Sequence, residues 1–170
     1  NIILNMGLGL SPQKGAMIKR ISSTEIEGFK MLGGICGMSS IHIVYFYAKL
    51  SKEPAKCGIW LDGRFFEKYQ REVAGNDVGA CFTFDTEQEE TVCVKLGTSF
   101  VSTENARLNV EQEMPGFDFD GTCQKAKEAW NKELSRIIVE GGTEDDKVKF
   151  YTAMYHTCLL YTSDAADEAR

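Results

Sequence analysis

Two histidines are the side chains best suited to acid–base or ligand chemistry in this chain of 170 residues. His42 lies in an apolar run, where a histidine most often makes a structural hydrogen bond within a strand or core, and we give it no role. His156 closes a predicted helix beside Tyr155 and Thr157, and it is the single candidate for substrate binding. The helix dipole alone also favours a histidine at a helix C-terminus, so a purely structural explanation stays open.

Pairs of acidic residues offer the other potential chemistry, that of a general acid beside a general base. Glu89–Glu90 falls in a predicted turn and Asp145–Asp146 in a predicted helix cap. Solvated carboxylates are common at both kinds of position, so neither pair is interpreted as catalytic. Trp60 and Trp130 could stack on the face of a sugar, but packing within a strand or helix is the more ordinary use of both. The residues alone therefore predict no catalytic set.

Cysteines could form disulfides, hold zinc or act as nucleophiles. They lie at positions 36, 57, 81, 93, 123 and 158, without the Cys-x-x-Cys spacing of a zinc site. A predicted hairpin that pairs Phe82 with Val94 places Cys81 and Cys93 on one face, but only diagonally. We therefore interpret most or all cysteines as small buried apolar residues, with a structural disulfide as the second interpretation and a catalytic thiol as the last.

The composition indicates a globular chain with a substantial core, since 43% of the residues are apolar, 26% are charged and three are prolines. A net charge of -6 and the lack of a Lys/Arg cluster argue against a nucleic-acid partner. The longest apolar run, Ile41 to Ala48, is far shorter than the ~20 residues that span a bilayer, so no membrane segment is predicted. Because the chain begins at Asn1 without a Met, we expect a truncated N-terminus that a signal peptide could precede.

Extended runs separated by turn residues follow one another up to about residue 101, which predicts a series of β-strands. Asp62–Gly63 has the chemistry of a tight hairpin turn, because glycine accepts positive φ without a steric penalty. From Ile41 to Ser51 both alternating sets of side chains are apolar, as in a strand buried on both faces. These features favour a β-sandwich in which that strand is central.

Helices are expected after residue 101, where the apolar period lengthens from two to between three and four. Ser102 can cap a helix over 103–113. The strongest apolar stripe of the chain then predicts a second helix over 119–137. A short strand is expected over 137–140, and Thr143 begins a capping pattern for a third helix. The sequence therefore predicts strands up to about residue 101 and mainly helices after it.

Several long runs resemble glycoside hydrolase family 92, the exo-acting α-mannosidases. The most specific are NARLNVEQEMPGFDFD and AWNKELSRIIVEGGTEDDKVKFYTAMYHT, preceded by RISSTEIEGFKM and IVYFYAKLSKEPAKCGIWLDGR. The resemblance spans about residues 2 to 157 and implies a mainly β fold with α: an N-terminal β-sandwich, linker helices and the first helix of an (α/α)6 barrel. The chain is then a fragment that holds the end of the first domain and the start of the catalytic one.

The resemblance also implies domain boundaries. Residues 1–101 are expected to belong to the β-sandwich domain, 102–136 to a helical linker and 137–157 to the start of the catalytic domain. The last stretch, CLLYTSDAADEAR, leaves the family pattern and resembles translated sequencing-adapter read-through. We therefore expect residues 158–170 to be a non-native tail.

The activity that the resemblance implies is an inverting, calcium-dependent removal of terminal α-linked mannose from mannose-containing glycans. In such a reaction one carboxylic acid protonates the leaving oxygen, and a carboxylate activates water on the opposite face of the sugar. Calcium, an oxygen-seeking cation, would hold mannose hydroxyls. No Asp or Glu of this chain matches the acid, the base or a calcium ligand, so no catalytic or metal-binding residue is assigned.

Two further expectations follow. The fragment alone is predicted to be inactive because it lacks the C-terminal barrel, and the parent enzyme is predicted to be periplasmic, at the cell surface or secreted. The alternative is a stand-alone β-sandwich that binds carbohydrate or serves as an accessory module. The family interpretation is favoured, because such a module would have no reason to carry the linker and the opening helix of the barrel.

Overall fold

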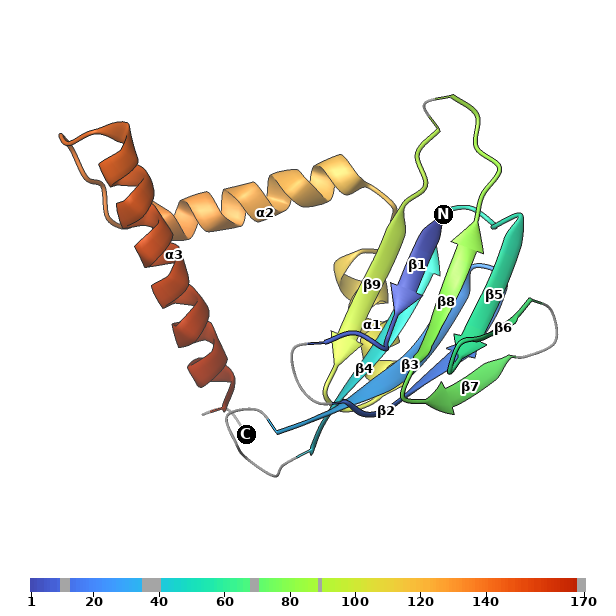
Figure 1. The fold of residues 1–170 in the computed structure, drawn as a ribbon. Coiled ribbons are helices and arrows are strands. Elements are labelled where there is room, and N and C mark those ends of the chain that lie inside the picture. Colours follow the sequence, from blue (N-terminus) through green and yellow to red (C-terminus); the bar gives the residue numbers. More distant parts are fainter. Residues whose placement is uncertain (10–12, 35–40, 68–70, 89, 168–170) are drawn as a thin grey trace. The chain divides into compact units, whose positions relative to one another are not determined.

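The computed structural model describes the chain except residues 10–12, 35–40, 68–70, 89 and 168–170, and for 159–167 it describes the backbone only. The chain divides into two compact units, Asn1–Asp118 and Phe119–Arg170. The first unit contains two antiparallel sheets and one helix, and the second contains two helices (Figure 1). Each unit is described by itself below.

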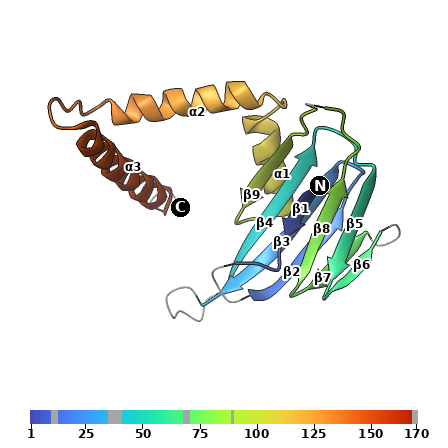
Figure 2. The same cartoon turned by 45° about the horizontal axis from the view of Figure 1, so that its top comes forward.

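The strands of the first unit form a four-stranded and a five-stranded sheet. In spatial order, the first sheet consists of β1 (Ile2–Asn5), β8 (Val78–Thr83), β5 (Lys56–Leu61) and β6 (Arg64–Phe66). The second consists of β7 (Glu72–Gly75), β2 (Gln13–Arg20), β3 (Glu25–Gly33), β4 (Ile41–Leu50) and β9 (Val94–Ser99). Figures 1 and 2 show the two sheets as separate layers. The predicted β-sandwich is therefore confirmed.

The core lies between the two sheets. Ile18 and Ile26 of the second sheet and Ile59 and Val78 of the first are all at most 2% exposed and belong to one apolar cluster. In β2 the residues on either side of Ile18 are more exposed, which is the two-residue period of a strand with one face buried. This alternation is the sequence signal that predicted the strands.

Strand β4 is covered on both faces along its second half, as the sequence predicted. Phe46 and Ala48 point into the core between the sheets, whereas Tyr47, on the other face, packs against the helix α1 (Thr103–Glu113). At the start of the strand the prediction is wrong, because Ile41 is 56% exposed. Tyr47, the β4 residue that clusters with the helix, lies in the half of the strand that also pairs with β9, from Tyr45 onward.

The tight turn at Asp62–Gly63 joins β5 to β6, as predicted. Both residues have positive φ, 49° and 76°, and Leu61 pairs with Arg64 across the turn. This geometry matches the right-handed twist of the flanking strands and suits an Asp-Gly dipeptide.

The predicted hairpin that pairs Phe82 with Val94 is wrong. Strand β8 pairs with β1 and β5 in the first sheet, so Phe82 faces Ile2 and Cys57, whereas Val94 in β9 faces Leu50 in the second sheet. The segment between them passes from one sheet to the other. Apolar alternation identified both strands but carries no information about which strand each one pairs with.

Helix α1 begins and ends where the sequence predicted. The Ser102 Oγ accepts a hydrogen bond from the Asn105 N–H at 3.1 Å, which satisfies one of the free N–H groups of the first turn. At the other end, the Lys95 Nζ donates to the carbonyl oxygens of Met114 and Pro115 at 2.7 and 3.3 Å. A cation at these carbonyls is stabilised by the helix dipole, so the C-terminal end of α1 is held to β9.

Close packing of α1 on the sheet depends on Gly97 of β9. A Cβ atom at this position would lie 2.4 Å from the Ala106 carbonyl oxygen and 2.5 Å from the Val110 side chain. Ala106 and Val110 are essentially buried. The helix is therefore an integral part of the sandwich unit, and the expected linker, 102–136, takes in helices of both units.

The second unit contains α2 (Phe119–Leu134) and α3 (Glu144–Asp167). The helix that the apolar stripe predicted is present as α2, although it ends before Ile137. The predicted strand over 137–140 is absent, and the Ile137 carbonyl oxygen instead accepts a hydrogen bond from the Tyr151 hydroxyl at 3.2 Å. A β-branched run forms a strand only with a partner, and this unit supplies none in the part that the structure describes.

The capping pattern that begins at Thr143 forms as predicted. The Asp146 N–H donates to the Thr143 Oγ1 at 3.2 Å, and the Asp146 carboxylate accepts from the Thr143 N–H at 3.1 Å. These bonds hold the pKa of the Asp146 carboxyl below its usual value. The backbone of α3 continues to Asp167, so His156 lies inside the helix, and its predicted position at the helix end is wrong.

Candidate functional site

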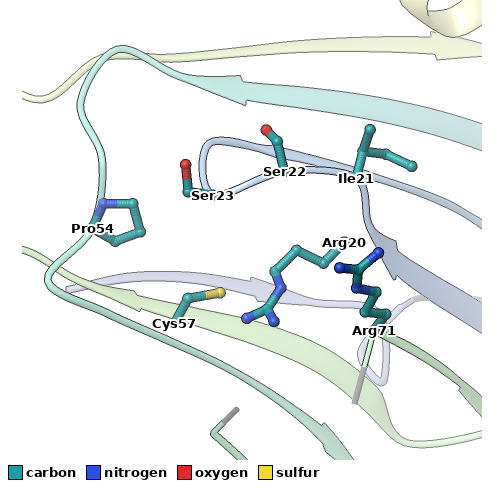
Figure 3. Close-up of a pocket in the computed structure, with 7 residues that line it drawn as sticks. All are labelled: Arg20, Ile21, Ser22, Ser23, Pro54, Cys57 and Arg71. Atoms are coloured by element: carbon teal, nitrogen blue, oxygen red, sulfur yellow. The ribbon is translucent and has the colours of Figure 1, made fainter. Parts of the chain in front are cut away.

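A surface pocket of about 330 Å³ at one end of the sandwich unit contains two arginines (Figure 3). Its described lining residues are Arg20, Ile21, Ser22, Ser23, Pro54, Cys57 and Arg71. They include two guanidinium groups and two hydroxyls, and none of them carries a carboxylate. We call this hollow the two-arginine pocket.

The pairing of β2 with β7 brings the two arginines together. Lys19 of β2 lies opposite Glu72 of β7, and the next residue, Arg20, donates its backbone N–H to the carbonyl oxygen of Arg71 at 2.8 Å. The two side chains therefore start from adjacent points of the backbone. Figure 3 shows the side chain of Arg20 reaching toward Cys57, with that of Arg71 entering the same pocket.

The two serines come from the turn between β2 and β3. The Ser22 Oγ accepts a hydrogen bond from the Thr24 N–H at 3.2 Å, and the Ser22 N–H donates to the Glu25 carbonyl oxygen at 3.2 Å. Both serines are exposed. Because the Ser22 oxygen already accepts from the backbone, its O–H remains able to donate into the pocket.

The thiol of Cys57 forms part of the pocket floor and packs against the sandwich core. Burial raises the pKa of this thiol, against a smaller lowering by the hydrogen bond from Arg20. The thiol is therefore neutral at pH 7 and does not cancel the charge of Arg20. None of the five described cysteines forms a disulfide, which agrees with the interpretation that favoured thiols, but all five are only partly buried, so the expectation of buried residues is wrong for them. Cys36 lies outside the described residues.

A second, larger hollow of about 650 Å³ lies on the outer face of the first sheet. Phe65 of β6 is 54% exposed, and its ring occupies the space above Gly58, where a Cβ atom would lie 2.1 Å from the ring. Lys56, Glu67 and Thr83 supply polar groups around this ring. We call this hollow the Phe65 groove. It shares Arg20 and Cys57 with the two-arginine pocket, so the two hollows adjoin.

Trp60 lies on the same outer face, opposite Phe65 in the pairing of β5 with β6. Its indole N–H donates to the Asp77 carboxylate at 3.0 Å. The sequence interpretation of Trp60 as a packing residue is consistent with this bond, because a fixed indole is an ordinary feature of a sheet surface. Its neighbour Phe65, which sequence reasoning did not single out, is the more accessible ring.

A charged cluster joins α1 to the second sheet. The Glu25 carboxylate accepts from the Lys49 Nζ at 2.9 Å and from Arg107 at 3.4 Å, and the Arg107 guanidinium lies 5.0 Å from the centre of the Tyr47 ring. The hydrogen bond from Lys49 holds the pKa of the Glu25 carboxyl below its usual value, although burial opposes this. Burial and the nearby Glu25 raise the pKa of Tyr47 to about 12. These groups fix the helix to the sheet, and we call them the Glu25 cluster.

Two residues singled out from the sequence, His156 and Trp130, belong to the second unit. His156 is exposed on α3 in the second unit, with its ring centre 5.7 Å from that of Tyr155. Trp130 contacts Tyr155 at 4.5 Å between ring centres, so its predicted packing role fits. The substrate-binding role of His156 stays a prediction.

The described residues do not fit a bound calcium ion. Within them, no three His, Cys, Asp or Glu side chains come close enough together to hold a metal. Glu89 lies outside the described residues, and Glu90 instead makes an ion pair with Lys52 at 2.7 Å. No step of the implied reaction can therefore be derived through calcium from this chain. Within the same residues, no helix is both long and apolar enough to cross a bilayer.

Sequence reasoning missed the two-arginine pocket because its parts come from four separate segments. Arg20 ends one strand and Arg71 precedes another, far along the chain, and each arginine by itself is an ordinary surface residue. Only the pairing of β2 with β7 brings them together, and that pairing has no local signal in the sequence.

The fold and its order of elements agree with comparisons to known proteins. Residues 1–99 match the family model of the Glycosyl hydrolase family 92 N-terminal domain, and residues 105–169 match that of the Glycosyl hydrolase family 92 catalytic domain. Both matches name a glycoside hydrolase, and they follow each other along one chain. The chain belongs to glycosyl hydrolase family 92.

Solved structures of this family have the same fold. The family GH92 α-mannosidase BT3965 from Bacteroides thetaiotaomicron is 28% identical, with a TM-score of 0.79 over 91% of this chain and 21% of its own. The family GH92 inverting mannosidase BT2199 from Bacteroides thetaiotaomicron is 25% identical, with a TM-score of 0.75 over 91% of this chain and 20% of its own. The chain therefore spans about a fifth of these enzymes.

A curated protein is similar over a shorter stretch. An uncharacterized secreted glycosidase from Arthroderma benhamiae is 31% identical over 72 residues, which make up 40% of this chain and 9% of that protein. The chain thus covers a small part of each protein to which it is similar.

Proposed function

We propose that this chain is the part of an α-mannosidase that joins the N-terminal β-sandwich to the catalytic domain. The observation that carries the proposal is the continuous order of the two family matches, 1–99 and 105–169. The likeness to BT3965, named an α-mannosidase, supports mannose as the sugar that the whole enzyme releases. The substrates are then glycans with terminal α-linked mannose.

The proposed reaction is hydrolysis with inversion, which the likeness to the inverting mannosidase BT2199 supports. Inversion needs a general acid and a general base on opposite faces of the sugar, about 6.5–9.5 Å apart, with a water between the base and the sugar. We assign neither role to a residue of this chain. The carboxylates and the calcium ligands are proposed to lie in the larger part of the catalytic domain that the matched stretch does not cover.

A location outside the cytoplasm is part of the proposal. The name of the secreted glycosidase from Arthroderma benhamiae supports it, and glycans with terminal mannose are met mostly outside the cytoplasm. Fractionation of the source cells, with an antibody against the β-sandwich, tests this part. Detection of the protein only in the cytosolic fraction would contradict it.

The test of the activity uses the whole protein encoded around this chain, with 4-nitrophenyl α-mannoside and an α-linked mannobiose as substrates. We expect the whole protein to release mannose first as the β-anomer, as proton NMR shows directly, and a chelator to abolish the release until calcium is restored. The chain of 170 residues alone should release none. Release of the α-anomer would contradict inversion, and no release of mannose by the whole protein would contradict the activity.

A second candidate function is carbohydrate binding by the sandwich unit itself. The observation that favours it is the exposed ring of Phe65, surrounded by polar groups in the Phe65 groove. A pyranose presents C–H groups on one face and hydroxyls around its edge, which suits an aromatic ring flanked by hydrogen-bonding side chains. Titration with mannobiose tests it: Phe65→Ala should abolish binding, whereas Phe100→Ala, at a ring 73% exposed and outside this groove, should not. Equal binding by both variants would remove this candidate.

A further inference from the structure

The outer face of the first sheet presents two aromatic rings. Ile59 of β5 is buried in the core, so its neighbour Trp60 points away from the core. Phe65 of β6 pairs with Trp60, and residues directly opposite each other in an antiparallel pair share a face of the sheet. Trp60 is partly exposed and Phe65 is 54% exposed. We call these two side chains the Trp60–Phe65 pair.

Each of the two rings rests against a glycine of the neighbouring strand. The ring of Phe65 occupies the space above Gly58 of β5, and a Cβ atom at that glycine would overlap it. The indole of Trp60 occupies the space above Gly79 of β8 in the same way. The strands β6, β5 and β8 follow one another in one layer (Figure 1). The two rings therefore lean in the same direction across the sheet, and since each reaches a different strand, neither covers the other.

The indole of Trp60 is held at both of its ends. Its N–H donates to the Asp77 carboxylate at 3.0 Å, and its six-membered ring lies against the backbone of Gly79. An aromatic side chain has two rotatable bonds, so a ring that is already positioned loses little conformational entropy when a ligand stacks on it. The packing of Trp60 on the sheet thus prepares the ring for binding and does not exclude it.

The spacing of the two rings sets the size of a ligand that contacts both. Gly58 pairs with Cys81 and Gly79 pairs with Trp60, so the two glycines are one strand and two residues apart. With strands about 4.8 Å apart and a rise of about 3.4 Å per residue, the two glycine Cα atoms lie about 8 Å from each other. A pyranose is about as large as one six-membered aromatic ring. One sugar therefore cannot stack on both rings, whereas a chain of sugars can.

Polar groups of both hydrogen-bonding types border the rings in the Phe65 groove. Lys56 is a donor, the Glu67 carboxylate is an acceptor, and the Thr83 hydroxyl is both. Sugar hydroxyls also donate and accept, and they surround the apolar C–H face that stacks on an aromatic ring. The groove, of about 650 Å³, is in the size range of ligand-binding clefts.

We propose that the Trp60–Phe65 pair binds a chain of sugars, an α-linked mannose oligosaccharide, with two of its sugars stacked on the two rings. This inference rests on the second candidate function, carbohydrate binding at Phe65, and adds to it a second ring and a minimum length of the ligand. In the whole enzyme, such a site would hold a long glycan away from the catalytic residues and raise its effective concentration there.

The experiment titrates the chain by isothermal calorimetry with α-linked mannose oligosaccharides of two and four units. We expect the longer ligand to bind about tenfold more tightly, as one further aromatic contact predicts. Trp60→Ala should remove this gain, Phe65→Ala should abolish the binding of both ligands, and the control Phe100→Ala should change neither affinity. Repetition of the sugar along the longer ligand favours it in every variant, so only the part of the gain that Trp60→Ala removes supports the proposal.

Tryptophan fluorescence gives a second measurement that does not depend on the folding of Trp60→Ala. The chain has two tryptophans, so Trp130→Phe in the second unit leaves Trp60 as the only one. The longer ligand should then change the emission of Trp60, and the shorter one should change it less. Equal affinities for the two ligands, or an unchanged emission with the longer one bound, would overturn the inference and leave a site for a single sugar at Phe65. Absence of binding by either ligand would remove the second candidate function together with this inference.

Discussion

The two units of the chain bury their apolar side chains very differently. In Asn1–Asp118 the two sheets enclose a cluster of buried residues, and α1 adds a smaller one with Tyr47, Ala106 and Val110. In the second unit no residue between Phe119 and Cys158 is buried. Burial of apolar surface is the main favourable contribution to folding. The sandwich unit therefore contains the contacts that make it stable, whereas α2 and α3 depend on local hydrogen bonds and a few aromatic contacts.

The exposed side chains of the second unit agree with this difference. Ile137 and Ile138 are 51% and 75% exposed, and Val148 is 64% exposed. An amphipathic helix gains most of its stability from packing its apolar stripe, so a stripe without cover leaves the helix marginal. The sandwich unit is thus expected to control the stability of the chain, and each prediction below changes one side of this comparison.

Removal of a core side chain should have the largest effect. Ile18→Ala removes a fully buried side chain from the sandwich core and should lower the free energy of unfolding by about 2–5 kcal/mol. The matched change in the second unit, Leu134→Ala, should leave the main transition where it is. Urea denaturation followed by circular dichroism measures both. Similar losses in the two variants would contradict the difference between the units.

An added methyl group between α1 and the sheet should have the next largest effect. In Gly97→Ala the new Cβ meets the backbone of Ala106, which cannot move without lifting the helix. We expect a loss of about 1–3 kcal/mol, the usual range for overpacking. The control is Gly116→Ala, where the nearest atom is 3.9 Å away. If Gly97→Ala is as stable as that control, α1 is not packed as described.

Removal of a helix cap should have a smaller effect on stability, and the effect should differ between the two units. Ser102→Ala deletes the cap of α1 and should destabilise the main transition by about 1 kcal/mol. Thr143→Ala deletes the cap of α3 and should lower the helical signal without moving that transition. Denaturation and far-ultraviolet circular dichroism distinguish the two outcomes. A shift of the main transition in Thr143→Ala would contradict this account, because it would show that the two units unfold together.

The pH dependence of the Glu25 cluster should give the smallest effect. Because the pKa of Glu25 is lowered in the folded state, its stabilisation is complete above the usual carboxyl pKa of 4.5 and is lost as pH falls through the lower folded value. Between pH 5 and 3, the wild type should therefore lose more stability than Glu25→Gln. Thermal midpoints across this pH range measure the difference. Equal changes of the midpoint with pH in the two proteins would show that the charge of Glu25 does not contribute to stability.

Much of the fold could be predicted because local signals determine it. The Ser102 and Thr143 caps and the Asp62–Gly63 turn all depend on residues within three positions of each other, and all three formed as predicted. The pairing of β8 and β9 was predicted incorrectly, because the choice of partner depends on the whole sandwich. Local signals thus gave the elements and not their arrangement.

The candidate site was beyond sequence reasoning for the same reason. Arg20 and Arg71 meet only because β7 joins the edge of the second sheet beside β2. His156 was predicted at a helix end because the pattern was read only to Thr157, whereas the backbone of α3 continues to Asp167. That residues 158–170 are a non-native tail stays a prediction.

Hydrogen exchange of the chain, measured residue by residue, tests the difference between the two units most directly. Amides of β3 and β4 should exchange only through global unfolding, because they lie inside the sheet and next to the buried core. Amides of α2, and of α3 up to Thr157, should exchange orders of magnitude faster, through local opening of helices without a buried face. Protection in α2 equal to that in β4 would contradict the account, because it would show that both units unfold as one.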